Sequence, residues 1–303
     1  MSLEQMMQTV MEDTAYLPQS NLTLSVSALS PGETDEVVGF LSERPIHTVI
    51  MMGLIRDNGL ISEHNRGSFY GCRNSEGRLE GVALIGHATL IETRMRRAIR
   101  ELALLAQLHK RLHMFMAEQE TAEVFWNSYA DEGQPMRFAC RELLLELSNA
   151  LEKSGQVEEL RLATLEDLHL VAPVHAGMAE EESGINPLET DPEGFLNRCS
   201  RRINQNRVWI VVKDDKLLFK ADIQAETPEL IYLEGVYVYP TERGTGLGRR
   251  CLTQLCTELL TRARLICVLV NEENERGQAF YRMCGFGRVS QYDTIFLKKD
   301  AIH

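Results

Sequence analysis

The clearest chemical signal in the sequence is a run of alternating glycines. It reads Arg243-Gly244-Thr245-Gly246-Leu247-Gly248-Arg249. Consecutive glycines let backbone N–H groups point into one concavity, and such a concavity at the start of a helix binds phosphate groups. A P-loop would need Lys after the last glycine, and a dinucleotide-binding fingerprint would need two residues between the second and third glycines. A different phosphate-binding loop therefore remains, with a tight turn that holds no ligand as the alternative.

The elements around this run must place it between a strand and a helix. Residues 230–239 have the composition of a strand, which ends at Pro240 because proline cannot donate to a strand ladder. From Leu247 to Ala263 the apolar residues follow helical spacing. Residues 265–270 form an apolar run typical of a strand covered on both faces, and a second helix is predicted from about 274 to 284. The second half therefore ends in the order β-α-β-α.

The residues before the glycine run complete this half. Residues 160–163 predict a short strand, and Thr164 with Asp167 three residues later predicts the start of a helix. Residues 208–212 and 217–223 form a predicted hairpin. Residues 178–192 contain four glutamates (180, 181, 182 and 189), one glycine and two prolines, and Glu193 follows directly. This composition favours a loop or a broken helix over a packed element.

The first half repeats the same order of elements. A hairpin with its turn at 74–77 precedes a strand through Leu90, and helices begin near 94 and 121. The equivalent helices of the second half begin near 246 and 274, at almost the same separation, whereas residues around 227–244 have no counterpart. We therefore predict a mixed α/β fold in two tandem copies, a first domain at 1–150 and a second at 151–303, as the length of 303 residues also suggests.

Two motifs in the second half resemble the GNAT superfamily of acyl-CoA-dependent N-acyltransferases. The pattern V-x-P-x-x-R-G-x-G-x-G is filled at every position from Val238 to Gly248. The pattern N-x-x-A-x-x-[LF]-Y-x-x-x-G-F is matched from Asn274 to Phe286, with Gly277 in place of alanine. The resemblance covers roughly residues 160–300, and it makes the first half similar to a degenerate copy of this fold or to an uncharacterised domain fused ahead of bacterial acetyltransferases.

The resemblance implies an acetyl-CoA site. Backbone groups of the strand would bind the pantetheine arm, the glycine loop would hold the pyrophosphate, and Asn274 would bind on the pantetheine side. The residues that it assigns to acetyl-CoA are Val236, Tyr237, Val238, Arg243, Gly244, Thr245, Gly246, Leu247, Gly248, Arg249 and Asn274. Tyr281 would donate the proton to the departing thiolate, because a phenol remains protonated at neutral pH.

The general base is less clearly marked. Some relatives carry a glutamate twelve residues before the acidic tyrosine, where this sequence has Leu269. Glu234 is our candidate, with Glu226 behind it, and either could instead be a solvated carboxylate on a strand.

Composition limits the partners. A net charge of −12 argues against nucleic acid or an anionic membrane as the main partner. The arginines at 94, 96, 97 and 100 are expected to form a solvated helix face, and His109 and His113 have no third ligand that would indicate a metal site. The seven cysteines contain no C-x-x-C and are predicted to be reduced and buried. No signal peptide or membrane span is predicted, so we expect a cytoplasmic protein.

The leading hypothesis is transfer of an acetyl group from acetyl-CoA to a primary amine by direct attack in a ternary complex. The glutamates between 180 and 193 favour a cationic acceptor. A tandem acyltransferase similar to mycothiol synthase is one alternative. A regulatory module that binds acyl-CoA without catalysis is another.

Overall fold

The computed structural model describes residues 23–149 and 155–298. The chain packs as two compact units that do not follow chain order. The first contains Met1–Leu144, Val270–Asn274 and Val289–His303, and the second contains Leu145–Leu269 and Glu275–Arg288. The predicted domain boundary between residues 150 and 151 lies outside the described residues. The same holds for residues 1–22, where no signal peptide is predicted.

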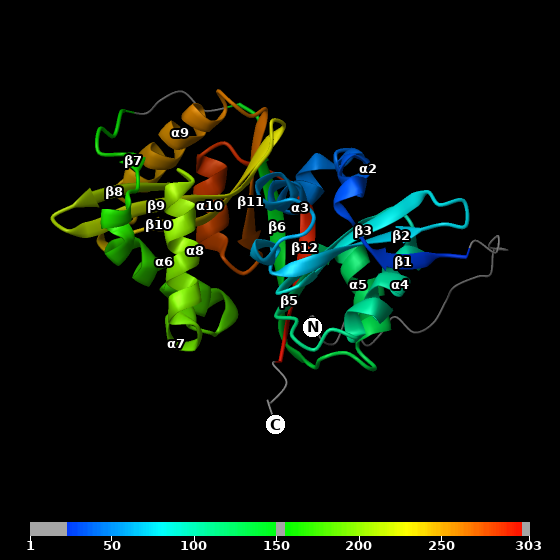
Figure 1. Ribbon diagram of the computed structural model, residues 1–303. Coiled ribbons are helices and arrows are strands. Elements are labelled where there is room, and N and C mark those ends of the chain that lie inside the picture. The colour runs from blue at the N-terminus through cyan, green and yellow to red at the C-terminus, as the bar shows by residue number, and fades with distance from the viewer. Residues whose placement is uncertain (1–22, 150–154, 299–303) are drawn as a thin grey trace. The chain divides into compact units, whose positions relative to one another are not determined.

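The second unit is built on a mixed sheet in the order β11-β10-β9-β8-β7 (Figure 1). Its strands are β7 (Arg161–Leu162), β8 (Val208–Lys213), β9 (Lys216–Glu226), β10 (Leu230–Val238) and β11 (Leu265–Asn271). Its helices are α6 (Leu168–Ser183), α7 (Pro187–Thr190), α8 (Pro192–Asn204), α9 (Leu247–Leu259) and α10 (Glu275–Met283). The mixed α/β class, the hairpin and the closing β-α-β-α order that we predicted are confirmed.

Local sequence explains where these elements begin and end. Thr164 and Asp167 form the expected capping box, on a 3₁₀ turn that precedes α6. Strand β10 stops at Val238, just before Pro240. Helix α9 buries its apolar face, which includes Leu252, Leu255 and Leu259. The glycine run is thereby fixed between a strand and a helix.

Residues 178–192 are more ordered than we predicted. Helix α6 continues through the first three glutamates to Ser183, the short α7 follows, and α8 begins at Pro192. Asn186 and Asp191 cap these helices by accepting hydrogen bonds from Leu188 N and Gly194 N. The broken-helix prediction is therefore the correct one, because side-chain caps and the prolines at the helix starts restart the helix after each interruption.

The first unit repeats this plan. Its sheet runs in the order β1-β2-β3-β4-β5-β12-β6 (Figure 1). Its strands are β1 (Ser25–Ala28), β2 (Gly67–Arg73), β3 (Leu79–Gly86), β4 (Ala88–Thr93), β5 (Met114–Glu118), β6 (Met136–Leu147) and β12 (Gly287–Leu297), and its helices are α2 (Thr34–Leu41), α3 (Pro45–Asn58), α4 (Arg96–Gln107) and α5 (Gln119–Tyr129). In both units an antiparallel hairpin leads into a parallel pair, β4 with β5 and β10 with β11.

The last strand of the chain completes the first unit. Strand β12 lies between β5 and β6 and pairs antiparallel with β5, with Ile295 opposite Phe115. Ile295 and Leu297 belong to the same core as Phe125 and Tyr129 of α5. Residues near the C-terminus therefore bury the same apolar surface as residues of the first half. Among the described residues, no helix is both long and apolar enough to cross a membrane.

This arrangement makes a stability prediction. Ile295→Ala should lower the free energy of unfolding of the first unit by about 2–5 kcal/mol, because it removes a fully buried side chain from that core. Urea unfolding would measure the loss, and amide exchange should quicken in β5 and α5. Val289→Ala, on the same strand but 44 % exposed, is the matched control and should change little. Equal effects of the two substitutions would contradict this packing.

Candidate active site

The glycine run forms an open loop at the start of α9. Gly244 and Gly246 have φ of 85° and 90°, a region that favours glycine. The backbone N–H groups of Gly244, Gly246, Gly248 and Arg249 donate no hydrogen bond within the described structure. The side chain of Arg243 instead donates from Nε to the Val238 carbonyl at 2.9 Å. The loop thus offers several free donors at the positive end of a helix, the arrangement that binds an anion.

Gly248 brings this loop close to the rest of the site. A Cβ atom at this position would lie 2.7 Å from Val238 Cγ2 and 3.3 Å from Phe280 Cε2. The third glycine of the motif is therefore required by close packing of the start of α9 against β10 and α10, and not by its φ angle.

Strand β10 stops pairing with β11, and changes its register with β9, just before the loop. It pairs parallel with β11 only from Leu230–Leu265 to Leu233–Val268, although both strands continue beyond that point. On its other side, the register with β9 shifts between Glu234 and Tyr237. Residues 236–238 thus lie past the end of the ladder to β11, although Tyr237 and Val238 still pair with β9, and they are partly exposed. Ligands of α/β sheets commonly bind at the carboxyl ends of neighbouring parallel strands.

A cluster of charged side chains lies at this point of β10. Lys220 and Asp222, both fully buried on β9, form an ion pair of 2.7 Å. Arg202 of α8 donates from Nη1 to Glu234 Oε1 at 2.7 Å and to Asp222 Oδ2 at 3.3 Å. Its Nη2 atom donates to Gln224 Oε1. Two carboxylates and two cations thus balance in a region of low exposure, as buried charges require.

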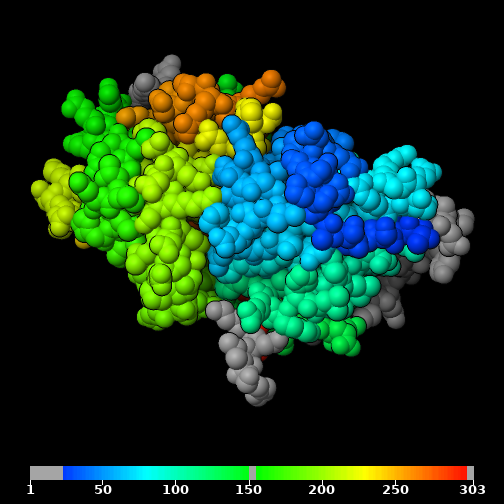
Figure 2. Space-filling view, in the orientation of Figure 1, coloured from blue at the N-terminus to red at the C-terminus, as the bar shows by residue number. Residues whose placement is uncertain are grey.

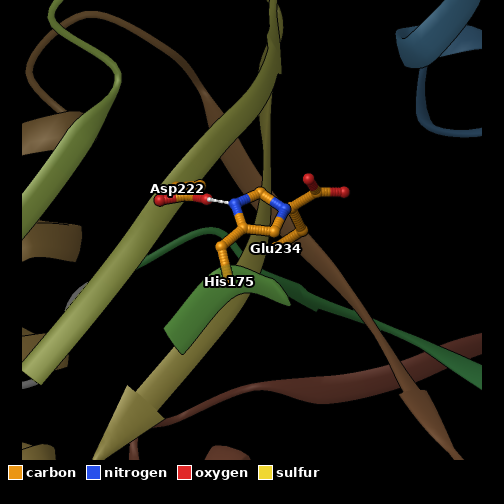
Figure 3. A group of neighbouring side chains, drawn as sticks. All are labelled: His175, Asp222 and Glu234. Carbon is orange, nitrogen blue, oxygen red and sulfur yellow. Dashed lines mark ion pairs between the residues drawn. The ribbon is translucent and has the colours of Figure 1, made fainter. Parts of the chain in front are cut away.

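His175 of α6 is the fifth member of this cluster. Its ring lies between the carboxylates of Asp222 and Glu234, with Nδ1 3.4 Å from Asp222 Oδ2 (Figure 3). Burial, and then the charge of Lys220, lower the pKa of His175 to about 3, although Asp222 opposes this shift. Burial alone would raise the pKa of Asp222, but Lys220 and Arg202 hold it below its usual value. His175 is therefore neutral at physiological pH.

This cluster has the donor types of a metal site but not the charge of one. The ligand atoms of His175, Asp222 and Glu234 lie within 4.8 Å of one another. The Arg202 guanidinium and the Lys220 ammonium already contact these carboxylates and neutralise them. A divalent cation would meet two positive charges there, so the residues do not fit a metal ion.

Tyr281 lies on α10 among aromatic side chains. Its ring makes edge-to-face contacts with Phe280 and Phe286, each at a centroid distance of 5.5 Å. Burial raises the pKa of the Tyr281 hydroxyl, and the nearby thiols Cys284 and Cys256 add to this shift. Its hydroxyl has no hydrogen-bond partner among the described residues. A phenol in this state keeps its proton and has a free donor.

The remaining predicted residues differ in their surroundings. Asn274 is exposed and directly precedes α10, in a short segment that packs with the first unit. Glu226, the reserve candidate for the base, ends β9 and pairs with Arg262 at 3.0 Å. Glu234 is partly exposed, and its Oε2 atom accepts no hydrogen bond within the described residues. Glu234 therefore lies closer to residues 236–238 along β10 and keeps one free oxygen.

The structure adds His175, Arg202, Lys220 and Asp222 to the residues that the sequence indicated. Lys220 and Asp222 gave a signal that could have been used, since they occupy alternate positions of the otherwise apolar stretch 217–223 and so share one face of a strand. His175 and Arg202 lie on helices more than twenty residues apart and gave no such signal.

The acidic segment is at the surface. Glu180, Glu181, Glu182, Glu189 and Glu193 are all exposed on α6–α8, the yellow-green region that is open to view in Figure 2. Burial raises the pKa of the Tyr237 hydroxyl of β10, Arg243 opposes this shift, and Tyr239 and Glu181 add to it.

A family model assigns the region that contains these features. Residues 176–286 match the model described as "Acetyltransferase (GNAT) family". The second unit contains a GNAT domain. The match runs from within α6 to just past α10 and therefore includes the bulged part of β10, the glycine loop and Tyr281. No curated protein sequence matches the chain.

Solved structures extend the GNAT fold over both halves. An acetyltransferase of the GNAT family from Colwellia psychrerythraea is 14 % identical, with a TM-score of 0.57 over 91 % of this chain and 100 % of its own. A tandem GNAT protein from the clavulanic acid biosynthesis pathway is 13 % identical, with a TM-score of 0.56 over 93 % and 100 %. A Drosophila protein is 12 % identical, with a TM-score of 0.66 over 91 % and 99 %. These similarities confirm two GNAT-like folds in tandem.

The first unit lacks the loop that marks the second. Only Arg94 and Met95 separate β4 from α4, and neither they nor the start of α4 include a glycine. The predicted degenerate copy thus keeps the strands and helices of the repeat but not the run of glycines.

The close approach at Gly248 can be tested. Gly248→Ala should lower the free energy of unfolding of the second unit by about 1–3 kcal/mol, because the added Cβ overlaps Val238. Urea unfolding is the measurement. Gly287→Ala is the control, since a Cβ there meets no atom within 4 Å. A Gly248→Ala protein as stable as this control would show that the start of α9 is not held against β10.

Proposed function

We propose that the second unit is an acetyl-CoA-dependent N-acetyltransferase that acts on a primary amine by direct attack in a ternary complex. The observation that carries this proposal is the set of free N–H groups at Gly244, Gly246, Gly248 and Arg249, next to the end of β10 that no longer pairs with β11. These donors suit the pyrophosphate of acetyl-CoA. The backbone of Val236, Tyr237 and Val238 would then bind the pantetheine arm.

In this proposal Tyr281 is the general acid. Attack of the amine forms a C–N bond and expels the CoA thiolate, which takes the phenolic proton. The raised pKa keeps Tyr281 protonated until negative charge develops on sulfur.

Glu234 is the proposed general base. Its Oε2 atom can accept the proton that the acceptor nitrogen must lose to attack as an amine, directly or through a water molecule, while Arg202 holds Oε1. The exposed glutamates of α6–α8 favour a cationic acceptor. We place this reaction in the cytoplasm, a compartment that suits the seven free cysteines.

The ion pair of Glu234 also favours a second candidate. Arg202 already occupies one carboxylate oxygen of Glu234 at 2.7 Å, a contact that suits a structural carboxylate as well as a base. A module that binds acyl-CoA and signals its presence without turnover would tolerate this pairing. Acetyl transfer to amines, measured after binding has been established, separates the two candidates.

Binding at the loop is the first prediction of this proposal. Gly246→Glu should weaken acetyl-CoA binding about 100-fold or more, because a carboxylate would face the pyrophosphate. Isothermal calorimetry measures this, with one equivalent per chain expected for the unmodified protein. Gly246→Ala imposes the same strain at φ 90° without the charge and should bind more tightly than Gly246→Glu. An unmodified protein that does not bind acetyl-CoA would remove the basis of the enzyme proposal.

Catalysis by Tyr281 is the second prediction. Tyr281→Phe should slow acetyl transfer by about 10- to 10³-fold at nearly unchanged acetyl-CoA affinity, since only the proton donor is lost. Steady-state rates and calorimetry on the same samples would show the split. Tyr70→Phe, in the first unit, is the control for loss of a hydroxyl. Equal rates for Tyr281→Phe and the parent protein would exclude Tyr281 as the acid.

A further inference from the structure

Lys220 is unusual because its ammonium is fully buried. Lysine is rarely buried to this extent, and a buried charge must be paired and hydrogen-bonded. Lys220 Nζ meets this need twice, with Asp222 Oδ2 at 2.7 Å and with the Gly235 carbonyl, to which it donates at 3.3 Å. The second contact reaches β10 at the point where that strand becomes irregular.

The irregularity is a β-bulge. Glu234 lies opposite Asp222 and Tyr237 lies opposite Lys220. Residues 235 and 236 of β10 therefore face the single residue 221 of β9. A bulge of this kind leaves backbone groups without ladder partners. The Gly235 carbonyl is one of these groups, and Lys220 supplies its hydrogen bond.

Gly235 and the ammonium fit each other closely. Gly235 has φ of 59°, which suits glycine, and a Cβ there would lie 2.8 Å from Lys220 Nζ and 3.3 Å from Asp222 Oδ2. The ammonium thus occupies the space that any larger residue at 235 would need. Lys220 Nζ thus both packs against Gly235 and donates the hydrogen bond to its carbonyl.

We infer that Lys220 is a positioning residue that holds the bulge of β10 and so directs the backbone of residues 236–238 toward the acyl-CoA arm. The second part of this inference rests on the proposed function. The first part concerns the bulge alone and holds whatever ligand the strand binds.

The surrounding charges give this role a second signature. Lys220 shares Asp222 with Arg202 and His175, and Arg202 also holds Glu234. Loss of the ammonium would therefore disturb the whole cluster. It would also remove a charge that lowers the pKa of His175, where Arg202, Arg198 and burial would still act in the same direction.

The test is Lys220→Met, which keeps the length of the side chain and removes the charge and the donor. Lys216→Met is the matched control, because Lys216 lies on the same strand and is exposed. We expect amide exchange at residues 235–238 to quicken at least about 10-fold relative to the rest of β10. We also expect acetyl-CoA to bind about 10-fold more weakly, with a smaller change in kcat at saturating acetyl-CoA. The His175 pKa, followed by NMR, should rise toward its ordinary value. Lys216→Met should change none of these quantities.

A second variant covers loss of folding. Since Lys220→Met leaves Asp222 with one cation fewer, Lys220→Met/Asp222→Asn removes both buried charges of the pair and should restore stability without restoring the bulge. The exchange and binding measurements are repeated on this protein.

The outcomes separate the two proposals. Unchanged exchange at 235–238 in both variants would overturn the role of Lys220, even if acetyl-CoA binds. Faster exchange with unchanged acetyl-CoA affinity would confirm that Lys220 holds the bulge, and it would overturn the part of Lys220 in acetyl-CoA binding. An unmodified protein that fails to bind acetyl-CoA would overturn the proposed function and the binding part of this inference, while the exchange result still decides whether Lys220 holds the bulge.

Discussion

The site depends on how β10 satisfies its backbone hydrogen bonds beyond the point where its ladder to β11 ends. A strand that stops pairing exposes N–H and C=O groups that need other partners. Beyond Leu233 the parallel ladder to β11 ends, and the bulge at Gly235 interrupts the ladder to β9. The Gly235 carbonyl accepts from Lys220, and the Val238 carbonyl accepts from Arg243. In the loop, the N–H groups of Gly244, Gly246, Gly248 and Arg249 donate no hydrogen bond within the described residues. The free groups are thereby concentrated at one end of the strand.

This arrangement carries a cost in buried charge. Lys220 and Asp222 are fully buried, and Asp222 Oδ1 has no partner within the described residues. Apolar residues of similar size would often make such a core more stable. Ionic groups can instead fix one backbone arrangement, because each charge accepts only a partner of the right sign and position. The cluster of Lys220, Asp222, Arg202, Glu234 and His175 connects α6, α8, β9 and β10 in this way.

The tandem repeat shows which parts of the plan serve the fold and which serve the site. Both units keep a hairpin and a parallel strand pair in which each strand is followed by a helix. These elements are enough to bury a core. Only the second has the glycine loop, which adds little apolar surface and leaves donors unpaired. In the first unit the short connection between β4 and α4 leaves no room for such a loop. At this segment the two copies thus differ in whether backbone donors are left unpaired.

The sequence alone determined the local features of this protein. Proline and glycine positions, helical spacing and the glycine run fixed β10, α9, α10 and the loop between them, because these signals act over a few residues. Six elements gave no such signal: β1, α2, α3, β6, α8 and β12. The sequence also indicated Glu234 and Tyr281, but it could not show that Arg202 holds Glu234 or that Lys220 lies beneath Gly235. Only the tertiary structure decided these contacts, and only it placed β12 between β5 and β6, because partners far apart in the chain are chosen by burial and charge pairing, which local spacing does not encode.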